Sequence, residues 1–129
     1  MLDDPNILKQ RDSGGALEVA AKIYQQANFD CQLRDAEHDA RELRNIIVAG
    51  MGGSALAADL AKSLLKEALT IPFDVIKDYN LPHYVGRDTL VIASSHSGNT
   101  EETLSCLEQA IERGCQIAII ATGGNVDEI

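Results

Sequence analysis

The sequence is short of cysteine and has no long apolar stretch. Its 129 residues include Cys 3 and no tryptophan. Cys31, Cys106 and Cys115 are odd in number, form no Cys-x-x-Cys pair and fall inside helix or strand patterns, which indicates reduced structural thiols rather than disulfides or a zinc site. The longest apolar runs, 46–49 and 117–121, are strand-sized and far below the ~20 residues of a membrane span. We therefore expect neither a disulfide framework nor a transmembrane helix.

Positive charge is also scarce. Lys+Arg 11 against Asp+Glu 20 gives a formal net charge of -9. A surface of this sign repels nucleic acid and anionic membranes, so we expect neither as a partner. The first residues lack the basic and apolar regions of a signal peptide, which predicts a cytoplasmic protein. With 45% hydrophobic and 24% charged residues, the composition is typical of a globular domain with one core.

The first 44 residues are polar and helical in pattern. Apolar residues from Leu17 to Ala27 recur at helical spacing after the breaker Ser13-Gly14-Gly15, and a second, weaker helix is expected from Asp30 to about Leu43. Asp35, His38 and Asp39 would share one face of that helix, but an exposed polar helix favours a solvated face over a metal site. We therefore predict an N-terminal helical segment over 1–44, followed by a domain over 45–129, and no bound metal.

Residues 45–129 alternate short apolar runs with helical patterns. The strands are expected at 46–49, 73–76, 90–93 and 117–121, which are rich in β-branched residues and unalternating. Two helices are expected between them, at 54–69 and 100–113, the second followed by Gly114. Their inward residues are expected to be Leu56, Leu60, Leu64, Leu65, Leu104, Leu107 and Ile111. The pattern predicts a doubly wound α/β fold, a parallel sheet with helices on both faces.

The end of the sequence opens another helix at Asn125, with Glu128 three positions on, and stops one turn later. A single helical turn is not stable alone and cannot cover a sheet. The expectation is a fragment of a longer protein, truncated after its fourth strand.

Two loops combine the features of an anion site. Gly50-Met51-Gly52-Gly53-Ser54 comes after the first expected strand and leads into a helix, whose free amides and positive dipole end favour an anion. Ser95, Ser97 and Thr100 come after the third strand and place three hydroxyl donors at another helix start. Loops at the carboxyl ends of parallel strands form the ligand crevice of such sheets, so these two are expected to face one phosphate.

A dinucleotide site is the rival interpretation of the first loop. Gly50, Gly52 and Ala55 satisfy the G-x-G-x-x-G/A fingerprint, and Asp78 ends the second strand where a ribose-binding acid would lie. A lone fingerprint is weak evidence, and a dinucleotide fold needs no hydroxyl cluster after its third strand. We therefore rank NAD binding below phosphate binding and expect no cofactor.

The combination of three segments resembles one family. The segments 50–54, Asp78-Tyr79-Asn80-Leu81-Pro82 and 95–103 resemble the N-terminal SIS (sugar isomerase) domain of bifunctional phosphoglucose/phosphomannose isomerases, over roughly residues 12 to 124. The resemblance implies a flavodoxin-like strand order, a second SIS domain in the same protein, and a homodimer. It also implies interconversion of glucose 6-phosphate or mannose 6-phosphate with fructose 6-phosphate, without a metal.

The same resemblance implies roles for individual residues. Gly52, Gly53 and Ser54 would lie against the sugar phosphate, and Ser95, Ser97 and Thr100 would bind its phosphate oxygens. His96 departs from the family, which usually has Tyr there. The family's catalytic Glu, ring-opening His and Lys would lie beyond Ile129, so no catalytic residue is expected in this chain. Glu101 and Glu102 suit the positive end of a helix and are expected to be dipole partners.

Two functions remain open from the sequence. The first is the phosphate-binding half of an aldose–ketose isomerase. The second is a non-catalytic SIS module that senses a sugar phosphate, which would need an attached DNA-binding element that the acidic first forty residues do not supply. The two functions require different sequences after Ile129, and an acidic base in a second SIS domain there would favour the enzyme.

Overall fold

The computed structural model describes residues 4–28, 33–34 and 39–127. Its contacts divide the chain into two compact units, residues 1–37 and 38–129. Within the described part of the chain, no helix combines the length and apolar character needed to cross a membrane.

The first unit is helical, as the sequence predicts for the stretch after Gly15. It contains α1 (Pro5–Arg11), α2 (Ala16–Lys22) and the 3-10 helix η1 (Ile23–Asn28). The side chain of Asp4 accepts a hydrogen bond from Asn6 N and so caps α1. The helix expected from Asp30 to about Leu43 is wrong at its C-terminal end, because residues 39–44 are not helical. Residues 29–32 and 35–38, which include Cys31, lie outside the described part.

The second unit is built on a parallel sheet. Its strands are β1 (Asn45–Gly50), β2 (Phe73–Ile76), β3 (Thr89–Ser94) and β4 (Gln116–Ile120), in the order β2-β1-β3-β4. Each pair is parallel, and β1 aligns with β3 from Asn45 opposite Thr89 to Gly50 opposite Ser94. The expected strands and doubly wound fold are confirmed.

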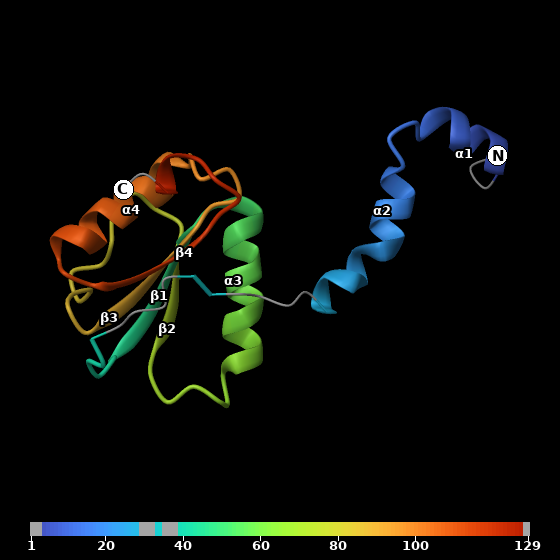
Figure 1. The fold of residues 1–129 in the computed structure, drawn as a ribbon. Helices are drawn as coiled ribbons and strands as arrows, with labels where there is room; N and C mark the ends of the chain where they lie inside the picture. Colours follow the sequence, from blue (N-terminus) through green and yellow to red (C-terminus); the bar gives the residue numbers. More distant parts are fainter. Residues whose placement is uncertain (1–3, 29–32, 35–38, 128–129) are drawn as a thin grey trace. The chain divides into compact units, whose positions relative to one another are not determined.

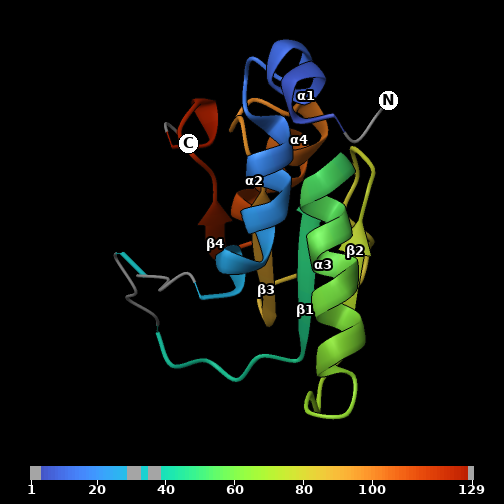
Figure 2. The ribbon, with the colours of Figure 1, turned by 90° about the vertical axis from the view of Figure 1, so that its right-hand side faces the viewer.

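The helices α3 (Gly52–Leu65) and α4 (Glu101–Glu112) cover opposite faces of the sheet (Figures 1 and 2). The strand order explains this arrangement. The connection from β1 to β2 and that from β3 to β4 step in opposite directions along the sheet, and right-handed crossovers then place their helices on opposite sides.

The core lies mainly between α4 and the sheet. Ile47 and Val91 on neighbouring strands pack with Cys106 and Ala110 of α4, and Leu81 from the β2–β3 connection completes the cluster. Cys106 is a free thiol whose pKa burial raises to about 11, and Cys115 is a half-buried free thiol whose pKa burial also raises. For these two cysteines, free thiols that are buried or half-buried agree with the expectation.

The sheet-facing side of α3 differs from the expectation. Ala55 and Ala58 are buried, and Asp59 and Lys62 on the same side form ion pairs with Lys77 and Asp74 beside β2. Positions i, i+3, i+4 and i+7 therefore face the sheet, and small alanines let the helix approach it closely. The expected inward leucines of α3 are wrong, because all four are at least 41% exposed (Leu56, Leu60, Leu64 and Leu65). On α4, Ile111 is 46% exposed and was also wrongly expected inward, whereas Leu107 is buried and Leu104 packs half-buried against the core, as expected.

Candidate functional site

The candidate site lies where the sheet changes its winding direction. β1 and β3 are neighbours, and the chain leaves them toward opposite edges of the sheet. Ligands of open α/β sheets bind outside the carboxyl ends of the strands at this switch point. The loops after Gly50 and Ser94 flank it, and the residues expected to bind phosphate belong to these two loops and to the helix starts after them.

The loop of residues 50–54, called the glycine loop below, approaches β3 closely. A Cβ on Gly50 would lie 2.7 Å from Ser94 O, so only glycine allows β1 and β3 to stay together at this point. The helix α3 begins at Gly52, two residues before the expected Ser54, and Gly52 has a positive φ of 52°. Both Gly52 and Gly53 are exposed, with open space where a Cβ would be.

The start of α3 offers backbone amides to a ligand. Its N-cap, Met51, makes no side-chain cap hydrogen bond. The amides of Ser54 and Ala55 donate to Met51 O, at 3.1 and 3.3 Å. Since the first amides of a helix have no partner within it, those of Gly52 and Gly53 point out of the helix end, where the dipole is positive.

The loop of residues 95–100, called the hydroxyl loop below, has three hydroxyl side chains that differ in burial. Ser95 is buried, Thr100 is half-buried and Ser97 is exposed. The Ser95 and Thr100 hydroxyls lie 2.9 Å apart and share a hydrogen bond, while Ser97 Oγ accepts from Asn99 N at 3.3 Å. Thr100 is the N-cap of α4 but makes no side-chain cap hydrogen bond, so this helix start is also open to an acceptor.

A third loop, residues 121–126 after β4, is hydrogen-bonded to the backbone of the hydroxyl loop. Thr122 donates to His96 O from both its amide, at 3.2 Å, and its hydroxyl, at 2.5 Å. Val126 N donates to Gly98 O at 3.0 Å. Sequence reasoning missed the role of this loop, whose only signal was Thr122-Gly123-Gly124 directly after a strand. The backbone of His96 is thus fixed, while its side chain is exposed.

The contact between these two loops depends on glycine. A Cβ on Gly98 would lie 1.7 Å from Gly123 O, and one on Gly124 would lie 2.4 Å from Ser97 O. Gly98 also has a φ of 69°, in the left-handed region. Backbone therefore packs directly against backbone here, and the shape of the hydroxyl loop is set by the loop after β4.

Two acidic residues beside the site, Asp78 and Glu101, accept hydrogen bonds from the β2–β3 connection. Asp78 Oδ1 accepts from the amides of Tyr79, at 2.6 Å, and Asn80, at 3.3 Å, which makes it a turn residue. Glu101 Oε2 accepts from the Tyr79 hydroxyl at 3.2 Å. The negative charge of Glu102, partial burial and this hydrogen bond all raise the pKa of Tyr79.

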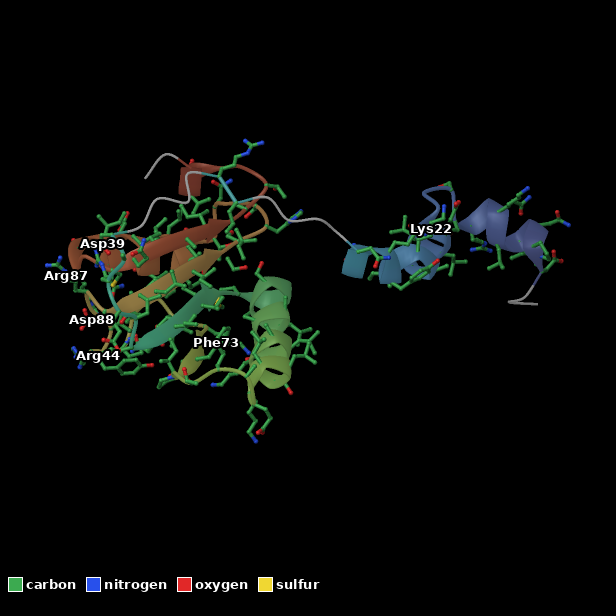
Figure 3. The ribbon with its side chains drawn as sticks, turned by 60° about the horizontal axis from the view of Figure 1, so that its bottom comes forward. Lys22, Asp39, Arg44, Phe73, Arg87 and Asp88 are labelled. Atoms are coloured by element: carbon green, nitrogen blue, oxygen red, sulfur yellow. The ribbon has the colours of Figure 1, made fainter. Side chains whose placement is uncertain are left out.

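The other ionisable residues considered from the sequence form no site. Asp39 pairs with Arg41, which lowers the pKa of Asp39 to about 2; Asp35 and His38 lie outside the described residues. Among the described residues, no cluster of three His, Cys, Asp or Glu could hold a metal. Arg87 and Asp88 lie at the amino ends of the strands, near Asp39 and Arg44 (Figure 3).

Comparison with curated proteins finds several relatives that share one name. The chain is 45% identical over 89 residues to a bifunctional phosphoglucose/phosphomannose isomerase of Caldicellulosiruptor bescii, covering 69% of this chain and 26% of that protein. It is 42% identical over 112 residues to the protein of the same name from Thermoplasma acidophilum, covering 87% of this chain and 34% of that protein. The chain thus spans about a third or less of the length of these relatives.

A solved structure shares the fold. A Bacillus subtilis protein described as a phosphosugar isomerase matches with a TM-score of 0.57 and 25% identity, over 65% of this chain and 27% of that one. The family model of the SIS domain matches residues 41–127, which include both loops of the candidate site. The chain therefore belongs to the SIS domain family.

Proposed function

We propose that this chain binds the phosphate group of a sugar 6-phosphate at the switch point of its sheet. The proposed binding groups are the amides or side chains of Gly52, Gly53, Ser54, Ser95, Ser97 and Thr100, all within residues 45–129. The observation that carries the proposal is the pairing of Gly50 with Ser94, which places both loops and both open helix starts at one edge of the sheet.

The chemistry of these groups suits a phosphate monoester. Its three terminal oxygens accept hydrogen bonds, and the two loops supply hydroxyl and amide donors together with two positive helix ends. Neither loop contains a lysine or arginine. The proposed site therefore holds its anion through dipoles and hydrogen bonds.

For the intact protein we propose an aldose–ketose isomerase that acts in the cytoplasm on glucose 6-phosphate, mannose 6-phosphate and fructose 6-phosphate. The names of the relatives and the SIS family support this activity. A carboxylate would remove the proton α to the carbonyl and return it to the neighbouring carbon through a cis-enediol. That base, a second SIS domain and a homodimeric partner would come from outside these 129 residues.

The role of this chain in that reaction would be to hold the substrate by its non-reacting end. Binding energy gained at the phosphate can orient the reacting carbons toward a base elsewhere. The 129-residue chain would then bind a sugar phosphate without converting it.

The test is a titration of the chain with glucose 6-phosphate and, separately, with NAD, monitored by amide shifts in NMR. We expect saturable shifts at 50–55 and 95–100 with the sugar phosphate and none with NAD. Ser97→Ala removes one donor to a charged acceptor, a loss of ~1.5–3 kcal/mol, so binding should weaken about ten- to a hundredfold. Ser63→Ala, on an exposed part of α3, is the matched control and should bind normally.

Shifts at 50–55 with NAD, and none at 95–100 with glucose 6-phosphate, would contradict the proposal and favour a dinucleotide site. Binding that is equal in the wild type and Ser97→Ala would remove the hydroxyl loop from the site.

A further inference from the structure

Side chains on one face of α4, and at its C-cap, are hydrogen-bonded to the connection between β2 and β3. Ser105 Oγ and Gln109 Nε2 donate to Tyr79 O, at 2.9 and 2.7 Å. One turn further, Arg113 donates to Pro82 O at 2.8 Å. Positions 105, 109 and 113 are four residues apart and so form a single stripe on the helix surface. The connection is thereby fastened to α4 through its backbone.

The same stripe continues to the first residue of α4, which is Glu101. Here the contact is made by a side chain: the Tyr79 hydroxyl donates to Glu101 Oε2 at 3.2 Å. A phenol with the ordinary pKa of 10.0 is protonated at neutral pH, and the charge of Glu102 raises the pKa of Tyr79 further, so its hydroxyl is a donor. Because its backbone carbonyl is held by Ser105 and Gln109, Tyr79 presents its ring from a fixed position.

The position of Glu101 matters for an anion at the start of α4. Cα–Cβ bonds of a helix tilt toward its N-terminus, so the first side chain reaches toward whatever binds there. A free carboxylate at this position would stabilise the helix dipole but repel a bound phosphate. The site therefore needs this carboxylate to be held to one side.

We propose that Tyr79 is a positioning residue that holds the Glu101 carboxylate against the β2–β3 connection and so keeps it away from the anion-binding start of α4. The proposal rests on the proposed function, because it concerns the same phosphate site. It assigns Tyr79 no contact with the substrate. Its effect on binding passes entirely through the charge of Glu101.

The test is a double-mutant cycle of Tyr79→Phe and Glu101→Gln, with the affinity for inorganic phosphate and for glucose 6-phosphate measured by calorimetry at low salt. Tyr79→Phe removes only the hydroxyl and keeps the backbone contacts. We expect it to weaken binding about two- to fivefold, the range of interactions between exposed charges. The loss should disappear in the Glu101→Gln background and shrink at high salt, where charge repulsion is screened.

Tyr84→Phe is the matched control, because the Tyr84 hydroxyl also donates to a carboxylate, Asp74 Oδ2 at 2.8 Å, near the amino end of β2. It should leave phosphate binding unchanged. An unchanged affinity in Tyr79→Phe, an equal loss in both backgrounds, or an equal loss in Tyr84→Phe would overturn the positioning role alone. Absence of phosphate binding in the wild type would overturn it together with the proposed function.

Discussion

Replacing Gly98 by alanine tests whether the loop after β4 shapes the hydroxyl loop. The new Cβ would lie 1.7 Å from Gly123 O and 2.7 Å from Gly123 C. Both are backbone atoms, so no side chain can turn aside. The two loops must separate, or the backbone at Gly98 must leave its φ of 69°.

The size of the effect depends on the hydrogen bonds that the separation breaks. A left-handed conformation costs a residue with a Cβ ~1–2 kcal/mol. The bonds that join the loops are those from Val126 N to Gly98 O, from Asn125 N to Asn99 Oδ1, and the two from Thr122 to His96 O. Each contributes ~1 kcal/mol net, so losing two to four of them together with the strain lowers the free energy of unfolding by about 3–6 kcal/mol.

Gly114→Ala is the matched control, because Gly114 has a φ of 66° but nothing within 4 Å of its Cβ position. It should show the strain alone, about 1–2 kcal/mol. The assay is urea unfolding monitored by circular dichroism, together with phosphate titration of each variant. We expect Gly98→Ala to lose binding and Gly114→Ala to keep it. Equal losses of stability in the two variants, or normal binding by Gly98→Ala, would refute the reasoning.

Three further predictions concern charge and reactivity. Pairing with Arg41 lowers the pKa of Asp39 to about 2. The ion pair therefore stabilises the fold fully above the ordinary carboxyl pKa, and this stabilisation is lost as the pH falls through about 2. In plots of the urea midpoint of unfolding against pH, Asp39→Asn should reduce the fall in the midpoint at acidic pH. Burial raises the pKa of Cys106 to about 11, so mass spectrometry should find its thiol unalkylated by iodoacetamide at pH 8 until the chain is unfolded. A coupled assay should find no turnover of glucose 6-phosphate by this chain. If the chain did turn it over, and Glu101→Gln or Glu102→Gln abolished that activity, the proposal that this chain binds the substrate without converting it would be contradicted.

The sequence by itself determined the strands and the residue types of the two loops. Unalternating β-branched runs separated by helical patterns predicted all four strands and their parallel pairing, because strands buried on both faces have no polar side. The glycines and hydroxyls of the two loops were also visible, since turn and capping chemistry depends on neighbouring residues. The topology rule for open sheets then placed the two loops at one edge.

The tertiary structure decided which face of each helix is buried and what holds the loops in shape. Helical spacing is the same on every face, so the leucines of α3 suggested a core side, whereas Ala55 and Ala58 face the sheet because small side chains allow close approach. The contact between Gly98 and Gly123 and the bond from Tyr79 to Glu101 join residues more than 20 positions apart. Spacing along the chain carries no signal for such contacts, which arise only when parallel strands bring distant loops to the same end of the sheet.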